Sequence, residues 1–177
     1  MSITADAIST ATSQKILMAW SDKLSVGIQE IDDQHKVLID FLNQLHNAIL
    51  HHHGADACGQ IMDKLCEYTK IHFAVEESIL RILDYPDYED HKNHHENLLS
   101  QVRSLRLKMQ TEDHSISFEL LHFLKKWLTI HIMEEDTAYT AHLLSCGAQA
   151  TTGKKTWVNK FWNGLKRNSK NNLHTLT

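Results

Sequence analysis

Five histidines and two carboxylates are spaced along this 177-residue chain in a way that would bring them together inside a helical bundle. They are His35, His72, Glu76, His91, His95, His131 and Asp136. His72 and Glu76 are four residues apart, as are His91 and His95, and this spacing puts both side chains of a pair on one helix face. A buried imidazole without a partner costs free energy. Five of them in one core therefore indicate metal binding.

The donor set also indicates which metal would bind and how many positions it would leave free. Five imidazoles, two bridging carboxylates and one bridging oxide or hydroxide would fill roughly 11 of the 12 positions that two octahedral ions need. The open position would admit one small ligand. A mixed nitrogen and oxygen set of this kind fits two iron ions best, although spacing alone leaves zinc as an alternative. No cysteine shares the pattern, which argues against zinc–thiolate and iron–sulfur sites.

The last carboxylate of the set is ambiguous. Asp136 lies five residues after His131, which on an α-helix turns it about 140° away from the histidine's face. Glu135 lies four residues after His131 and would share that face. Helical spacing alone therefore predicts Glu135 as the ligand, and only a local distortion would turn Asp136 inward.

Apolar residues at steps of three and four define the helices that would carry these ligands, and each histidine replaces an apolar residue in its series. The series cover residues 28–49, 61–83, 88–109 and 121–143. Gly54, Pro86 and Gly147 supply stop signals between or after them. Short connections predict an all-α, antiparallel up-down-up-down four-helix bundle, a topology that can bring all the ligands to one level.

Composition divides the chain into three parts: an N-terminal arm (1–20), the bundle (21–147), and a linker with a basic tail (148–177). The tail has six basic residues and no acidic ones, so the remainder has 12 basic and 22 acidic residues, a charge of −10. An acidic body argues against nucleic acid as a partner. Trp157, Phe161 and Leu165 form the apolar stripe of a predicted amphipathic tail helix, which would dock on a protein or lie on an anionic membrane surface.

The predicted location is the cytoplasm, with peripheral membrane association through the tail. The beginning of the sequence lacks the pattern of a secretory signal. No apolar run approaches the ~18 residues that a spanning helix needs. The odd set of Cys58, Cys66 and Cys146 is typical of reduced thiols.

Several segments together resemble the hemerythrin family, particularly its bacterial branch. They are Trp20-Ser21-Asp22, IQEIDDQH ending at His35, HFAVEE from His72, HKNHH from His91, and WLTIHIMEED from Trp127. The resemblance covers about residues 18–145 and matches seven ligand positions in order. It implies that Asp136, rather than Glu135, bridges two irons together with Glu76.

The resemblance also implies a function and a division of the ligands. One iron would be held by His91, His95 and His131, and the other by His35 and His72 with an open position for oxygen. Phe73, Trp127 and Leu128 would line an apolar oxygen pocket. The expected function is reversible dioxygen binding for storage, delivery or sensing, without catalysis. The alternative is a di-iron enzyme that acts on peroxide, nitric oxide or oxygen. A ferritin-like site is disfavoured because Glu119 and His122 form only one E-x-x-H unit.

Overall fold

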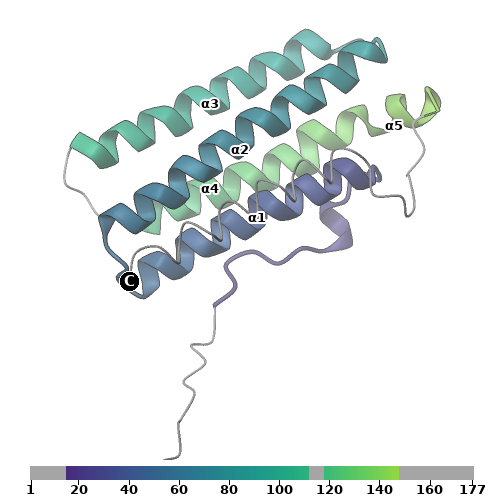
Figure 1. Cartoon of the computed structure of the whole chain (residues 1–177). Coiled ribbons are helices and arrows are strands. Elements are labelled where there is room, and N and C mark those ends of the chain that lie inside the picture. The colour runs from purple at the N-terminus through teal and green to yellow at the C-terminus, as the bar shows by residue number, and fades with distance from the viewer. Residues whose placement is uncertain (1–14, 112–117, 148–177) are drawn as a thin grey trace, which may run out of the picture.

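Four long helices follow one another along the chain in the computed structural model (Figure 1). The structure describes residues 15–111 and 118–147, with side chains for 15–107 and 120–147. A short 3-10 turn, η1 (Asp22–Leu24), precedes α1 (Gln29–Leu50), α2 (Ala55–Ile82), α3 (Tyr88–Thr111) and α4 (Phe118–Ile130). A π-helical turn, η2 (His131–Asp136), and α5 (Thr137–Ser145) follow. The prediction of an all-α four-helix protein is confirmed.

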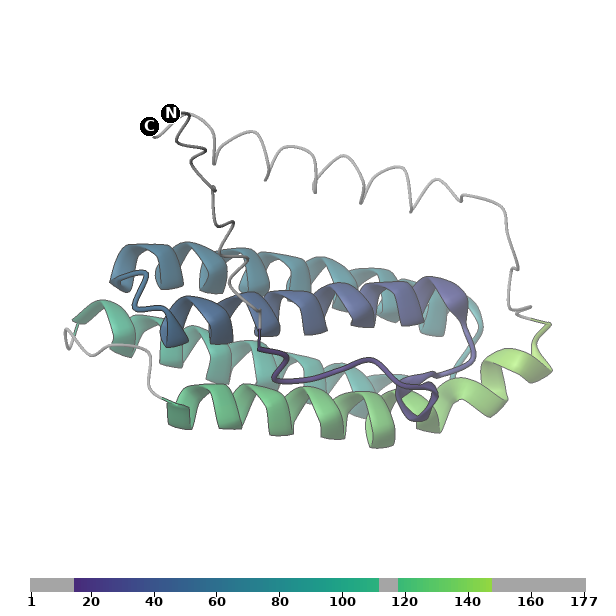
Figure 2. The same cartoon turned by 90° about the horizontal axis from the view of Figure 1, so that it is seen from below.

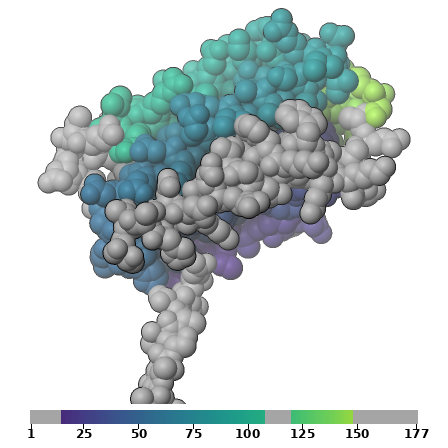
Figure 3. Space-filling model, in the orientation of Figure 1, coloured from purple at the N-terminus to yellow at the C-terminus, as the bar shows by residue number. Residues whose placement is uncertain are grey.

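Successive helices run in opposite directions along the bundle, as the colours in Figure 1 show. Residues 51–54 connect α1 to α2, and residues 83–87 connect α2 to α3. Helix α1 packs against α2 and α4, and α2 packs against α3. Figure 3 shows α2 and α3 side by side along one edge of the molecule. This arrangement directs one face of every helix toward a shared interior.

The connections follow from local backbone chemistry. Gly54, with φ of 86°, precedes α2 in a conformation that L-residues avoid. Asp84 adopts φ of 51° just before Pro86, where the helix cannot continue. Helix α2 nevertheless begins at Ala55, six residues before the apolar series predicted its start. The predicted series left out Cys58, which is buried in the first turns of α2 and belongs to the same buried face.

The apolar core contains the residues that periodicity predicted. Ile31, Leu38, Leu42 and Leu45 of α1 are at most 1% exposed, and His35 occupies the same stripe. The segment before α1 runs beside that helix (Figure 2), and Asn43 of α1 ties the two together. The Asn43 side chain accepts hydrogen bonds from the backbone amides of Leu17 and Met18. It also donates one to the Met18 carbonyl at 2.8 Å.

The fourth helix departs from the prediction of one continuous α-helix over residues 121–143. A π-helical turn from His131 to Asp136 interrupts it. Thr137 donates its hydroxyl proton to the Ile132 carbonyl, five residues back, at 3.0 Å. Thr140 donates to the Val26 carbonyl at 3.1 Å and so ties α5 to the loop before α1. Uniform α-helical periodicity does not describe this stretch, because a π turn bonds residue i to i+5.

Two predictions about the ends of the chain remain predictions. The arm falls partly, and the tail with Trp157, Phe161 and Leu165 wholly, outside the described residues. None of the helices in the described part is both long and apolar enough to cross a bilayer.

Candidate metal centre

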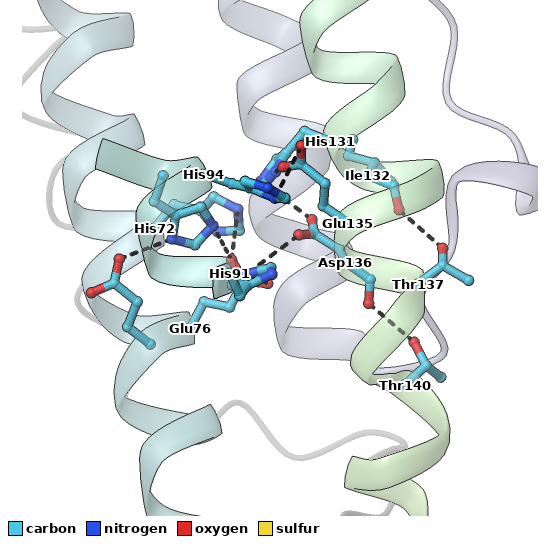
Figure 4. A network of polar contacts seen from close by, with 12 residues as sticks. His72, Glu76, His91, His94, His131, Ile132, Glu135, Asp136, Thr137 and Thr140 are labelled. Atoms are coloured by element: carbon cyan, nitrogen blue, oxygen red, sulfur yellow. Dashed lines mark hydrogen bonds and ion pairs between the residues drawn. The ribbon is translucent and has the colours of Figure 1, made fainter. Parts of the chain in front are cut away.

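The seven predicted ligands meet in the interior, and each is at most 5% exposed. Helix α1 contributes one of them, α2 and α3 two each, and η2 the last two. Figure 4 shows the side chains of His72, His91, His131 and Asp136 converging between the helices. The bundle therefore brings together residues that lie up to about a hundred positions apart in the sequence.

Ligand atoms fall into two groups of four, and within each group they all lie within 4.8 Å of one another. The first group contains His72, Glu76, His131 and Asp136, and the second contains Glu76, His91, His95 and Asp136. Both groups share the two carboxylates. The remaining histidine, His35, places its Nε2 atom 2.9 Å from Asp136 Oδ2. Two carboxylates shared between two sets of nitrogen donors could each contact a pair of cations.

The polar atoms of this cluster have no hydrogen-bond partners among the described residues. They comprise the Nε2 atoms of all five histidines and both side-chain oxygens of Glu76 and Asp136. Buried polar groups are almost always satisfied, and each one left unpaired costs about 1–3 kcal/mol. Nine such atoms facing one another fit metal coordination, because a cation would satisfy them together.

Three of the histidines are oriented by hydrogen bonds on the opposite side of the ring. The Nδ1 atom of His72 lies 2.8 Å from Gln34 Oε1, that of His95 2.9 Å from Glu77 Oε1, and that of His131 2.9 Å from Glu135 Oε2. An amide or carboxylate oxygen only accepts, so each Nδ1 carries the proton and donates it. Each Nε2 atom therefore keeps its lone pair toward the cluster, as a metal ligand must.

The structure separates the two acidic candidates on η2. Asp136 is fully buried in the cluster, whereas the Glu135 side chain is 22% exposed and supports His131 from outside. The π turn explains this, since residues five apart align along it. The half-exposed His94 lies with its Nδ1 atom 3.6 Å from Glu135 Oε1 (Figure 4). Sequence reasoning missed Gln34 and Glu77 as supports.

Burial sets the protonation of the imidazoles. It lowers the pKa of His35 well below its usual value, that of His72 to about 4 and that of His95 to about 2. These effects outweigh the Glu76 carboxylate, which raises all three pKa values. The three rings are therefore neutral at pH 7, the form that binds metals.

The two buried carboxyl groups differ in protonation in the metal-free fold. Burial raises the pKa of Glu76. The adjacent His91 and the other imidazoles together have a larger, opposite effect and bring this pKa well below its usual value. Burial and the Glu76 charge together raise the pKa of Asp136 well above its usual value. A cation between them would displace the proton from Asp136 and release it on binding.

An apolar wall covers part of the cluster. Phe73 stacks on the His95 ring with centroids 3.6 Å apart, and Trp127 lies parallel to the His131 ring at 5.8 Å. Leu128, three residues before His131, is 1% exposed. All three residues predicted to line an oxygen pocket are thus buried, and two of them contact ligand rings.

Comparison with known proteins agrees with this geometry. Residues 26–143 match the family model described as the Hemerythrin HHE cation binding domain. The matched span is more than half of the chain. It includes every residue of the buried cluster.

The chain belongs to the hemerythrin family.

Relatives and solved structures support this membership. Bacteriohemerythrin of Stenotrophomonas maltophilia is 40% identical over 131 residues, covering 72% of this chain and 84% of the relative. Bacteriohemerythrin of Pseudomonas aeruginosa is 34% identical over 122 residues, covering 69% of this chain and 78% of the relative. A crystal structure of wild-type hemerythrin superposes with a TM-score of 0.68 and 28% identity, covering 72% of this chain and 98% of that one. The family resemblance predicted from the sequence is confirmed.

Proposed function

We propose that this hemerythrin-family chain binds dioxygen reversibly at a pair of iron ions bridged by oxide or hydroxide. The observation that carries the proposal is the buried cluster in which five Nε2 atoms surround two shared carboxylates. Bound iron would supply the electrons that oxygen takes up and returns. Such binding would serve oxygen storage, delivery or sensing.

The proposed ligand division gives His91, His95 and His131 to one iron and His35 and His72 to the other, with Glu76 and Asp136 bridging. The assignment of His131 to the first iron has to be justified, because its ligand atom also lies within 4.8 Å of that of His72. The His131 ring centroid is 5.2 Å and 6.3 Å from those of His95 and His91, compared with 6.1 Å and 6.5 Å from those of His72 and His35. The ring separations favour the division that the family resemblance implies.

The residues of the chain hold the centre and keep it dry. Gln34, Glu77 and Glu135 fix three imidazoles in the ligand tautomer by accepting from their Nδ1 atoms. Such supporting partners typically contribute 10–100-fold to metal affinity. Phe73, Trp127 and Leu128 keep water from the pocket, which slows the loss of reduced oxygen species and so favours reversibility.

The proposal is tested by metal content and optical spectra of the full chain. We expect about two irons per chain by elemental analysis, consistent with a seven-ligand set of this type. A visible charge-transfer band should appear on oxygenation and disappear when oxygen is removed under argon. One iron per chain, or bleaching that no cycle of oxygenation restores, would contradict reversible binding.

The pocket assignment makes a separate prediction for Leu128→Ala. Deleting this buried side chain should cost about 2–5 kcal/mol of stability and leave room for water beside His131. The oxygenated band should therefore decay at least several-fold faster, as followed by absorbance after oxygenation. Leu45→Ala is the matched control, because Leu45 is equally buried on α1 but about 15 Å along the helix from His35. Equal decay rates in both variants would remove Leu128 from the pocket.

A further inference from the structure

A line of oxidisable side chains connects the buried cluster to the surface. It begins at Tyr139, which is fully buried with its ring centroid 5.5 Å from that of the ligand His91. The Tyr139 phenol also lies beside the Glu76 carboxyl, and burial together with that carboxyl raises the pKa of the phenol. Tyr139 therefore adjoins two of the proposed iron ligands, His91 and Glu76.

The line continues outward through three residues in contact. The ring of Tyr85 lies 6.3 Å from that of Tyr139, edge to face, and 5.4 Å from that of His142. His142 is fixed by its Nε2–H, which donates to the Leu83 carbonyl at 2.7 Å. Cys146 Sγ lies 3.6 Å from the same Nε2 atom. The contacts are continuous from the proposed iron ligand to the thiol.

The thiol at the end of this line is the accessible one. Cys146 is exposed, whereas Cys58 is buried and Cys66 half-buried. Burial also raises the pKa of the Cys58 and Cys66 thiols, which makes both less reactive. Cys146 is therefore the cysteine of this chain that can meet a second thiol from solution.

Phenols and thiols share a property that phenylalanine and leucine lack, which is the loss of one electron to a strong oxidant. Electron transfer slows exponentially with distance, so rings in contact divide one long transfer into short ones. We propose that Tyr139, Tyr85 and His142 form an electron-transfer path from Cys146 to the buried cluster. The proposal rests on the di-iron function proposed above, because the path needs an electron acceptor at its buried end.

The path would protect the protein when hydrogen peroxide reacts in the pocket. Cys146 gives up one electron through the path and its proton to water. A low-molecular-weight thiol then bonds to the resulting sulfur radical, losing its own proton, and the adduct returns the second electron by the same route. The sum is one peroxide plus two thiols giving one mixed disulfide and two waters, so atoms and electrons balance. The damage is thereby moved to a reversible bond at the surface.

The test follows Cys146 oxidation in the iron-loaded full chain after addition of hydrogen peroxide and glutathione. Mass spectrometry with alkylation of free thiols measures the mixed disulfide, and freeze-quench electron paramagnetic resonance measures tyrosyl radicals. We expect Tyr85→Phe, which keeps the ring but removes the phenol, to slow disulfide formation at Cys146 at least tenfold. Cys146→Ser should instead prolong the tyrosyl signal, because its electron donor is gone.

Two controls isolate the path. Tyr68→Phe removes a phenol that packs against Phe41, off the path, and should leave the rate unchanged. The metal-free chain gives the direct rate of thiol oxidation by peroxide, which should not depend on Tyr85.

The outcomes separate this proposal from the proposed function. Equal rates in Tyr85→Phe and the unaltered chain, with iron retained, overturn the path and leave oxygen binding standing. A Tyr85-dependent rate in a protein that fails to bind oxygen reversibly supports the path and overturns the oxygen function. A chain that takes up no iron overturns both.

Discussion

Replacing His72 by alanine is expected to abolish oxygen-dependent absorption while the four helices persist. His72 is fully buried, and its Nε2 atom faces Glu76 and the other imidazoles. Losing a ligand should weaken metal binding by more than the 10–100-fold that supporting residues contribute. The Gln34 oxygen, now without its donor, adds a cost of about 1–3 kcal/mol. Far-ultraviolet circular dichroism should therefore remain helical while iron content and the visible band fall.

The matched control for this variant is His122→Ala. His122 lies exposed on α4, outside the cluster, so its removal takes away an imidazole without touching a ligand. That variant should keep both irons and its spectrum. If oxygen binding survived in His72→Ala, or disappeared equally in His122→Ala, the assignment of the open iron would be wrong.

The positions of the histidines on the core stripe were predictable because helical periodicity is a local property. His35 occupies a place in the series that Ile31, Leu38 and Leu42 also occupy, and all are buried. Short connections then leave few ways to pack four such helices. The cluster follows once the helices alternate in direction, which is why spacing along the sequence was enough to bring it together.

Helical periodicity alone does not predict Asp136 as a ligand. An α-helix would have presented Glu135, and the family resemblance was needed to choose its neighbour. The π turn from His131 to Asp136 supplies the missing rotation and leaves Glu135 to hold His131 from behind. The π turn could not be predicted from the residues that form it, because such turns are rare and occur inside otherwise regular α-helices.

The supporting partners differ in how far sequence could reach them. Glu135 lies four residues from His131, so an i,i+4 contact could have been expected from spacing. Gln34 reaches His72 across 38 residues, and Glu77 reaches His95 across 18. These contacts depend on how α1 and α3 each rotate against α2. That rotation is a property of the packed core and is not encoded in any one segment.

The folding stability of the metal-free chain is expected to depend strongly on pH. Burial lowers the pKa of His35, His72 and His95 in the metal-free fold, so between about pH 4 and 6.5 the unfolded chain binds more protons at these sites. Stability therefore falls as pH decreases through this window. Asp136 opposes the trend, because its raised pKa makes the folded state bind one extra proton. Three histidines against one carboxyl leave a net slope of about 3 kcal/mol per pH unit.

Metal should steepen this slope, because bound imidazoles and Asp136 stay deprotonated in the folded chain, whereas the unfolded chain releases the ion and takes up protons on its histidines. Urea unfolding followed by circular dichroism, at several values between about pH 5 and 7, measures the free energy of unfolding with and without iron. The metal-free chain should lose several kcal/mol over this range, and the loaded chain should lose more while remaining the more stable of the two as long as iron is bound. The His122→Ala variant lacks only an exposed histidine, so its stability should show the same dependence on pH as that of the unaltered chain. Equal slopes with and without metal would mean that the buried imidazoles are not the groups that bind it.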